Sequence, residues 1–596
     1  MRRNTVSVKI GDLFIGSDHA IKTQSMTTAS TADTKSSVDE AIRIFDAGGK
    51  LVRFTAPSIK EAKNLKNIRN TLIQKGYNKP LVADIHFTPN AAIVASEIVE
   101  KVRINPGNFV DKKKFEVKEY DNESYQDEVK KIEKKFISLI NSCKENNTAL
   151  RIGTNHGSLS DRIMNNFGDT PNGMVESAME FLRVCKNENF DQIVLSMKSS
   201  NPIVMIHAYR LLVKSMDSEN MFFPLHLGVT EAGDGLDGRI KSALGIGTLL
   251  SEGLGDTIRV SLTEDPEFEI PAAEKILSKI ESFKIKKSNF NNIRAFSYFK
   301  RDTFTVENIG RDNPPIVISS DENSFEDNSS DYIFVTELTD LSADRNYILP
   351  QNQWKKAKNK NIFPFYESVQ EFRKSEKKSD NINFINLSFR RIKNTINQSF
   401  QENVIFVLDV SGKSRHDLVD AIDFFEEQDI KNPIIFRGNY EHEDFEKVAI
   451  DASIDIGSLF LEGMGNGIWL SSEKHNDKIN ELSFLILQNT RTRIFKTDYI
   501  SCPSCGRTKF DLQQTTLMVK EHTSHLKGLK ISVMGCIVNG PGEMADADYG
   551  YVGSGTGFIS LYKGKQLVKR NIPSKHAVDE LIHLIKENGD WIEPKL

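Results

Sequence analysis

The sequence predicts an α/β protein with an N-terminal (β/α)8 TIM barrel, a degenerate barrel-like α/β insert in the middle and a small C-terminal α+β domain. About 280 residues at the start alternate apolar runs with helical patterns eight times. Part of the middle region repeats part of the first, and glycine-rich turns near the C-terminus carry cysteines. We predict domains at residues 1–284, 285–488 and 489–596, and we expect the insert to be structural.

Composition excludes several classes of protein. With 39% hydrophobic and 27% charged residues, the 596-residue chain is typical of globular proteins, and its formal net charge of -4 argues against a globally basic nucleic-acid binder. No apolar run is long enough to span a membrane, and the first residues, MRRNTVSVKIGDLFIGSDHA, lack an apolar signal core. We therefore expect a cytoplasmic protein. The five cysteines do not form a disulfide framework, and Cys143 and Cys185 fit buried thiols in helical patterns.

The first domain contains eight strand-like runs, each followed by a helical pattern. In order, the runs are AIKTQSM, KLVRFTA, PLVADIHF, KVRINPG, ALRIGTNHG, DQIVLSMKSS, PLHLGVTEA and DTIRVSL. Eight strand–helix units are the number that closes a (β/α)8 barrel. After the fourth run comes a long charged helical pattern with an apolar stripe that includes Ile132, Phe136 and Leu139, which predicts a helix on the barrel surface.

Polar side chains follow the predicted strands at their C-terminal ends, where barrel enzymes place their chemistry. Five of them are cations: Arg53, Arg103, Arg151, Lys198 and Arg259. Asp84 and Glu231 are the obvious counter-charges, so we expect the mouth to hold a polyanion, most simply a diphosphate. The alternative is that each arginine pairs with a neighbouring carboxylate. Asn155 and Ser261 end the fifth and eighth strands.

Two titratable residues at the mouth each have two interpretations. Glu231 is either a general acid or base among the cations or one half of a structural salt bridge. His86 either shuttles a proton or is a hydrogen-bonded residue at the end of a strand. The sequence alone leaves both questions open.

The middle region contains an internal repeat. GSLFLEGMGNGIWLSS, which starts at Gly457, aligns without gaps with GTLLSEGLGDTIRVSL, which starts at Gly247. The alignment pairs Glu252 with Glu462, whereas Arg259 is replaced by Trp469. Strand-like runs recur around it as PPIVISS, DYIFVTEL, NIFPFY, INFINLS, NVIFVLDVSG and NPIIFRG. We infer a degenerate complete or partial second barrel that kept its packing residues and lost the phosphate-binding mouth.

Three cysteines near the C-terminus predict a metal centre. Cys502 and Cys505 form a C-x-x-C pair in SCPSCGRTKF, and Cys536 lies in the glycine-rich turn VMGCIVNGPGE. A zinc site would take His522 or His525 as its fourth ligand, but both lie in a stretch that fits a surface connection. Glu543 is the better candidate, since it follows Cys536 through NGPG and would give iron a displaceable oxygen ligand.

Eight motifs occur in a family-specific order: TQSM, LVADIHF, RINPG, RIGTNHGSL, HLGVTEAG, LLSEGLGDTIRVSL, CPSCGRTKFDL and GCIVNGPGE. Together they resemble the 4-hydroxy-3-methylbut-2-enyl diphosphate synthase family, the reductive enzymes of the non-mevalonate isoprenoid pathway. The resemblance covers about residues 5–280 and 490–565, and the middle region corresponds to the insert of the family's longer, three-domain form. In shorter members another subunit supplies the partner barrel, and we expect the insert to let one chain fold back on itself.

The resemblance implies reductive ring opening and dehydration of 2-C-methyl-D-erythritol 2,4-cyclodiphosphate to (E)-4-hydroxy-3-methylbut-2-enyl diphosphate. It implies a [4Fe-4S] cluster on Cys502, Cys505, Cys536 and Glu543, with the substrate at the unique iron once Glu543 has left. Electrons would come from a flavodoxin or ferredoxin, and Glu231, with His86 and Glu543, would be catalytic. Substrate contacts would come from Arg53, Asp84, Arg103, Arg151, Asn155, Lys198, Arg259, Ser261 and Asn539.

Other classes make different predictions. A barrel enzyme that handles a pterin phosphate, with a zinc-stabilised tail, predicts zinc and no sensitivity to oxygen. A nucleic-acid-binding protein with a C-x-x-C knuckle is disfavoured by the acidic balance. We expect a monomer or homodimer that binds neither nucleic acid nor a membrane.

Overall fold

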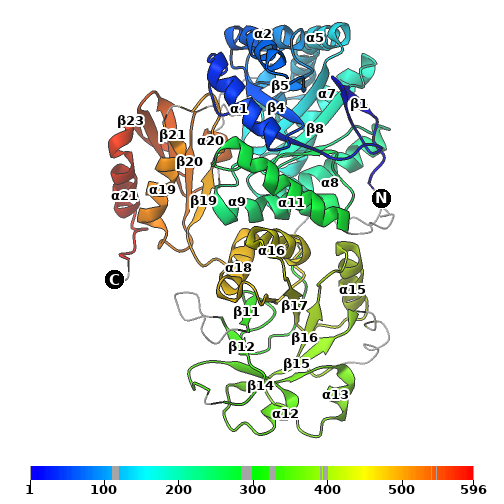
Figure 1. The fold of residues 1–596 in the computed structure, drawn as a ribbon, viewed down its shortest axis with the longest axis vertical. Helices are drawn as coiled ribbons and strands as arrows, with labels where there is room; N and C mark the ends of the chain where they lie inside the picture. The colour runs from blue at the N-terminus through cyan, green and yellow to red at the C-terminus, as the bar shows by residue number, and fades with distance from the viewer. Residues whose placement is uncertain are drawn as a thin grey trace. The chain divides into compact units, whose positions relative to one another are not determined.

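The computed structural model describes residues 2–110, 120–282, 299–320, 330–339, 341–389, 392, 400–508, 510–537, 540–544 and 546–594, without the side chains of Asn122, Pro541 and Glu543. The chain forms two compact units. One is built mainly from Met1–Ser278 and Lys496–Leu596, and the other mainly from Ser297–Phe495 (Figure 1). The predicted domain boundaries remain a proposal, and the one at 284/285 lies outside the described residues.

Eight parallel strands form the barrel of the first unit. They are β3 (Lys22–Met26), β4 (Leu51–Thr55), β5 (Leu81–Ile85), β6 (Lys101–Ile104), β7 (Ala149–Asn155), β8 (Ile193–Lys198), β9 (His226–Leu227) and β10 (Thr257–Ile258). Their order is β8-β7-β6-β5-β4-β3-β10-β9, and a parallel bridge from Leu195 to Leu225 joins the two ends of the sheet. Each strand falls within one of the eight predicted runs, so the predicted barrel is confirmed.

Helices follow these strands as the pattern predicts. The longer ones are α1 (Thr34–Asp46), α2 (Ile59–Gln74), α3 (Pro89–Ser96), α5 (Asn122–Asn146), α7 (Pro171–Asn187), α8 (Pro202–Ser218), α9 (Gly235–Ser242) and α11 (Glu269–Ser282), and the short ones are α4 (Pro106–Phe109), α6 (Asp161–Phe167) and α10 (Thr248–Ser251). Side chains cap several of them; Ser58 accepts from the amide of Lys60 at the start of α2. Helix α5 buries Ile132, Phe136 and Leu139, which confirms the predicted apolar stripe.

A hairpin at the start of the chain was missed by the sequence analysis. Strands β1 (Val8–Ile10) and β2 (Leu13–Ile15) pair antiparallel around a turn in which Gly11 has a φ of 59°. Their buried side chains form one apolar cluster with residues at the beginnings of barrel strands: Leu51, Val82, Ala149 and Val194. The hairpin therefore covers the N-terminal end of the barrel and leaves the opposite end for the site.

The second unit contains a complete closed barrel. Its parallel strands are β11 (Ile316–Ser319), β12 (Tyr332–Phe334), β13 (Tyr347–Pro350), β14 (Ile362–Tyr366), β15 (Asn383–Leu387), β16 (Val404–Asp409), β17 (Ile434–Asn439) and β18 (Gly467–Ser471). The described helices are α12 (Gln351–Trp354), α13 (Val369–Lys374), α15 (Arg415–Glu427), α16 (Phe445–Ala452), α17 (Ser458–Phe460) and α18 (Asn476–Asn489). The prediction of a second barrel is confirmed, although β13 was not among the predicted runs.

The repeat has the same local structure in both barrels. One turn of π-helix, Ala243–Gly247 in the first barrel and Ser453–Gly457 in the second, leads into a short helix. The aligned glutamates each pair with an arginine from an earlier helix, Glu252 with Arg210 at 2.5 Å and Glu462 with Arg415 at 2.7 Å. These shared features support descent of both segments from one repeat.

The mouth of the second barrel differs from that of the first. Trp469, which replaces Arg259, packs in a buried cluster with the rings of Phe334 and Phe365. Arg437 stacks over Trp469, with 5.3 Å from its guanidinium carbon to the ring centroid. Apolar packing thus occupies the place of the cation in the first barrel.

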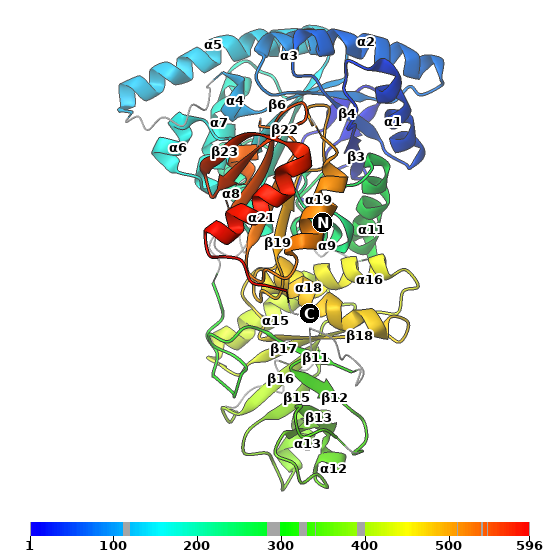
Figure 2. The ribbon, with the colours of Figure 1, turned by 90° about the vertical axis from the view of Figure 1, so that its left-hand side faces the viewer.

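The C-terminal residues form a five-stranded sheet in the first unit. Its strands are β19 (Asp498–Ser501), β20 (Lys530–Met534), β21 (Tyr549–Gly555), β22 (Phe558–Lys563) and β23 (Gln566–Pro573); the first three are parallel and the last two antiparallel to their neighbours. Helices α19 (Leu512–Thr523) and α21 (Ala577–Glu587) bury their apolar sides against it (Figure 2), and α20 (Gly540–Glu543) follows β20. No helix in the described part of the chain has the length and apolarity needed to cross a membrane.

Candidate functional site

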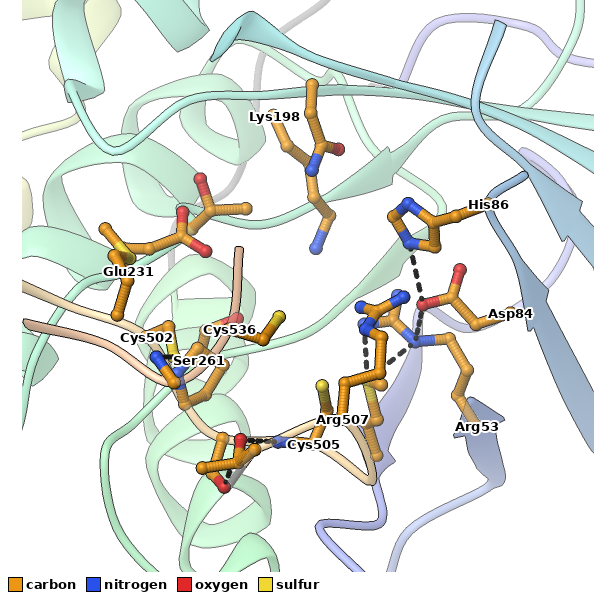
Figure 3. Close-up of a pocket in the computed structure, with 18 of the residues that line it drawn as sticks. Arg53, Asp84, His86, Lys198, Glu231, Ser261, Cys502, Cys505, Arg507 and Cys536 are labelled. Atoms are coloured by element: carbon orange, nitrogen blue, oxygen red, sulfur yellow. Dashed lines mark hydrogen bonds and ion pairs between the residues drawn. The ribbon is translucent and has the colours of Figure 1, made fainter. Parts of the chain in front are cut away.

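One pocket in the first unit brings the two predicted site regions together. Its wall includes strand-end residues of the barrel and the loops that carry Cys502, Cys505 and Cys536 (Figure 3). The predicted barrel residues on this wall are Arg53, Asp84, His86, Arg103, Asn155, Lys198, Glu231, Arg259 and Ser261. A single chain therefore supplies both the cations and the thiols.

Arg103 is the centre of a hydrogen-bonded network on one side of the pocket. Its Nη1 lies 2.8 Å from Asp84 Oδ1 and 2.7 Å from His86 Nε2. Its Nη2 donates to the Gly153 carbonyl at 2.8 Å and to Asn155 Oδ1 at 3.0 Å. Burial raises the pKa of Asp84, but the charges of Arg103 and Arg53 outweigh it and hold that pKa well below its usual value. Arg103 thus has the carboxylate partner that the simpler alternative foresaw.

Arg259 has a partner that the sequence analysis missed. Glu269, the first residue of α11, accepts from Arg259 Nε at 2.9 Å and Nη2 at 2.8 Å. Ser25 Oγ also donates to the Glu269 carboxylate at 2.7 Å. The two-pronged pair fixes the plane of the guanidinium. The sequence signal for this pair was a glutamate, Glu269, at the start of the helix that follows the eighth strand.

The other barrel cations have weaker pairing. Arg53 contacts Met26 Sδ and lies 3.8 Å from Asp84, and burial is the main cause that lowers its pKa to about 9. Burial, with the nearby arginines, also lowers the pKa of Lys198 well below its usual value. Arg151 lies deeper, does not line the described pocket, and has three buried side-chain nitrogens without hydrogen-bond partners. Its contact with a substrate remains a prediction.

Glu231 has an unusual backbone. It is a buried residue with a φ of 50°, a left-handed conformation that a side chain with a β-carbon seldom adopts. Its Oε2 atom is buried and unpartnered. Strain of this kind persists where a side chain must point to a fixed place, and here the carboxylate faces the pocket.

His86 is held neutral in this arrangement. Burial, and next the charge of Arg507, lower the pKa of its imidazole to about 3, although Asp84 opposes the shift. Its Nδ1 atom is buried without a partner. Because the Arg103 guanidinium can only donate to Nε2, the neutral ring carries its hydrogen on Nδ1, which is an unpartnered donor.

The thiols are placed by neighbouring parallel strands. Cys502 directly follows β19 and Cys536 comes two residues after β20, so both lie at the same edge of the sheet. The Gly535 amide donates to Cys502 Sγ at 3.3 Å, the type of bond that stabilises thiolate ligands. Burial raises the pKa of Cys502 to about 12, whereas the Cys536 thiol and Arg507 lower that of Cys505.

The fourth ligand is not defined here. Glu543 is in α20, but its side chain is outside the described residues, and so is all of Asn539. His522 is exposed and His525 half-buried; they bond to the carbonyls of Met518 and Ile592, respectively, and neither lines the pocket. Among the described residues, no three His, Cys, Asp or Glu side chains are close enough to hold a single metal ion. Zinc held by these histidines is therefore not favoured.

Arg507 is the second residue that sequence reasoning missed. It follows Cys505 by two residues and lines the pocket. Burial opposes the charge of Arg507, but Cys505, Cys536 and Asp84 outweigh that effect and raise its pKa. The sequence signal for this residue was its position in CPSCGRTKF, next to the predicted metal ligands.

Two family models match the chain. One, described as the GcpE TIM-barrel domain, covers residues 5–274, and the other, the GcpE protein C-terminal domain, covers residues 498–587. The chain is 47% identical to "4-hydroxy-3-methylbut-2-en-1-yl diphosphate synthase (flavodoxin)" of Phocaeicola vulgatus, with 99% of each chain covered. Proteins of the same name from Parabacteroides distasonis (47%, 99% of each chain) and Leptospira interrogans (43%, 100% of this chain and 98% of the other) are similarly close.

Proposed function

This chain belongs to the GcpE family, and on that premise we propose that it catalyses the reductive ring opening and dehydration of 2-C-methyl-D-erythritol 2,4-cyclodiphosphate. The product is (E)-4-hydroxy-3-methylbut-2-enyl diphosphate. The observation that carries the proposal is the single pocket, in which barrel cations face three cysteine thiols of the same chain. A diphosphate needs the first group, and a two-electron reduction needs the second.

The barrel side binds and orients the substrate. Arg53, Lys198 and Arg259 place positive charge on one wall, and Ser261 and Asn155 offer polar contacts nearby. The paired Arg103 and Arg259 are held rigid by Asp84 and Glu269, which favours a fixed position of the phosphates. Deeper in the barrel, Arg151 adds to the positive potential.

Glu231 is the proposed proton donor to the leaving hydroxyl. Its strained backbone aims a buried carboxyl at the pocket, where the substrate excludes water. His86 is the proposed proton relay on the opposite wall, where the Nδ1 of its neutral imidazole is an unpartnered donor. Asp84 fixes the imidazole and the two neighbouring arginines, so its contribution is positioning.

The thiols fit an iron–sulfur cluster. Cys502, Cys505, Cys536 and, as proposed fourth ligand, Glu543 would hold a [4Fe-4S] group. When bound, this group supplies single electrons and a Lewis-acidic iron. The Gly535 amide at Cys502 is a donor that stabilises the negative charge of a thiolate ligand, and the positive charge of Arg507 lies near Cys505. Three thiols with a carboxylate suit iron better than the two histidines, which lie outside the pocket, suit zinc.

The electron donor is a small soluble carrier. Relatives carry the qualifier "flavodoxin" in their names, and we propose a flavodoxin, or a ferredoxin as the second choice, for this chain in the cytoplasm. No partner beyond this carrier and the small-molecule substrate is proposed.

Anaerobic purification, followed by iron and sulfide analysis and electron paramagnetic resonance of the reduced protein, tests the proposal. We expect about four irons per chain and a spectrum that changes when the cyclic diphosphate is added, together with formation of the linear diphosphate. About one zinc per chain, or a wild-type protein that leaves the cyclic diphosphate unchanged, would contradict the proposal.

A further inference from the structure

Arg507 approaches the pocket from the side opposite to the barrel cations. It belongs to the loop that carries Cys502 and Cys505, and its side chain extends from that loop toward Arg53 and Asp84 (Figure 3). No other arginine or lysine of the C-terminal sheet domain lines the described pocket.

One hydrogen-bond donor of Arg507 has no partner among the described protein groups. Its Nε atom is buried from solvent and has no hydrogen-bond partner. Asp84, the carboxylate whose charge acts on Arg507, already accepts from Arg103 at 2.8 Å and also lies 3.8 Å from Arg53. A buried guanidinium with an unpaired donor is unfavourable unless an anion completes it.

The charge balance around Arg507 points in the same direction. Arg53, Arg103, Lys198 and Arg259 line the same pocket, and their carboxylate neighbours are Asp84, Glu231 and Glu269. The C-terminal part of the pocket wall adds the positive charge of Arg507 and three thiols, but no described carboxylate. An anion that enters the pocket therefore meets Arg507 on one side and the barrel cations on the other.

We propose that Arg507 is a substrate-binding residue, which contacts the phosphate oxygens from the cysteine side of the pocket. This inference rests on the proposed function, because it assigns a further contact to the same cyclic diphosphate. One consequence is that the substrate bridges barrel and cysteine loop, so its binding holds the two parts of the pocket together. A guanidinium suits this task because its planar fork matches phosphate oxygens two at a time.

The test compares Arg507→Gln and Arg507→Lys with wild type as anaerobically purified holoenzymes. Arg570→Gln is the matched control, since Arg570 is an exposed arginine of the same sheet domain outside the pocket. Inorganic pyrophosphate is the probe, and calorimetry measures its affinity without turnover. We expect Arg507→Gln to weaken pyrophosphate binding at least about tenfold, Arg507→Lys to fall between it and wild type, and the control to remain within about twofold.

Iron content and turnover separate the possible results. We expect both Arg507 variants to keep the wild-type iron content and the substrate-free resonance spectrum, while KM for the cyclic diphosphate rises. Pyrophosphate affinity unchanged in Arg507→Gln would overturn the inference, and so would loss of iron from both variants, which would assign Arg507 to the metal centre. If wild type binds pyrophosphate through Arg507 but does not convert the cyclic diphosphate, the proposed function fails and this contact stands.

Discussion

Gly542, in α20 after the third cysteine, lies directly against the carbonyl oxygen of Gly157 in the barrel. A β-carbon at position 542 would overlap that carbonyl group. A second close approach has the same form, because a β-carbon at Gly506 would come within 2.8 Å of the Ala29 carbonyl oxygen. Both glycines neighbour the cysteine loops, so the absence of side chains there lets the sheet domain sit close to the barrel mouth.

Gly542→Ala should therefore hold the cysteine loops away from the substrate. Because a displacement of about 1 Å can reduce a positioned reaction about 100-fold, we expect a fall in kcat of that order with the iron content unchanged. Steady-state kinetics on the holoenzyme measures this. Gly555→Ala is the control, since a β-carbon there meets nothing within 4 Å. Equal kcat values for Gly542→Ala and wild type would show that the contact is not needed.

Glu269→Gln should weaken substrate binding through Arg259. The substitution removes the charge that orients the guanidinium, and loss of a charged hydrogen bond of about 1.5–3 kcal/mol corresponds to a fall of about 10- to 150-fold in kcat/KM. Kinetics with varied cyclic diphosphate checks the effect. Glu267→Gln, which removes an ion pair with the half-exposed Arg43, should leave kcat/KM unchanged. A Glu269→Gln enzyme with wild-type kcat/KM would contradict the positioning role.

His86 should make the fold sensitive to acid. The pKa of His86 is about 3 in the folded protein and near 6.5 in the unfolded chain. The unfolded state therefore binds more protons between these values. The stabilising effect of the neutral imidazole is complete above pH 6.5 and is lost as the pH falls toward 3.

His86→Asn should remove this dependence. In wild type, the one extra proton bound by the unfolded state should lower the free energy of unfolding by about 1.4 kcal/mol for each pH unit that the pH falls within this range. Denaturant unfolding at several pH values, with wild type and variant side by side, measures the difference. Parallel curves for the two proteins would mean that His86 already titrates near its ordinary pKa when folded.

The second barrel should affect stability without affecting the pocket. Glu462→Gln removes the charge that pairs with the buried Arg415 at 2.7 Å, and breaking a buried pair destabilises by about 3–5 kcal/mol. We expect earlier thermal unfolding with pyrophosphate affinity within about twofold of wild type. Leu517→Gln, an exposed apolar residue elsewhere, serves as the stability control. A large loss of pyrophosphate affinity in Glu462→Gln would contradict a purely structural role for the insert.

Periodicity was sufficient to predict the elements that are buried on both sides. Strands such as β5 (LVADI) and β8 (IVLSMK) are rich in apolar residues, and such runs stand out from the helical patterns between them. The hairpin β1–β2 and strand β13 were missed because they are short. The strand character of the hairpin depends on packing against distant residues such as Leu51 and Val82. The repeat that starts at Gly247 and Gly457 correctly predicted a second barrel, because its glycines and its glutamate recur at the same spacing. Both copies also follow a turn of π-helix.

The sequence predicted which residues form the site better than it predicted which side chains pair with them. Cations at strand ends follow from the barrel rule, but whether each is paired depends on side chains from other elements. Glu269 reaches Arg259 from the next helix, and Arg507 reaches the pocket from a loop more than 200 residues away. Neither contact has a sequence period, which is why both were missed. The depth of Arg151 likewise depends on how the barrel layers pack.

The most direct measurement uses two inactive variants in one preparation. Glu231→Gln lacks the proposed proton donor and Cys502→Ser lacks a proposed ligand, so each should be inactive alone. Because one chain builds the whole pocket, co-expression of the two variants should give no more activity than either variant purified by itself. Recovered conversion of the cyclic diphosphate in the co-expressed sample would show that barrel and cysteines come from different chains, and would contradict a site formed within one chain.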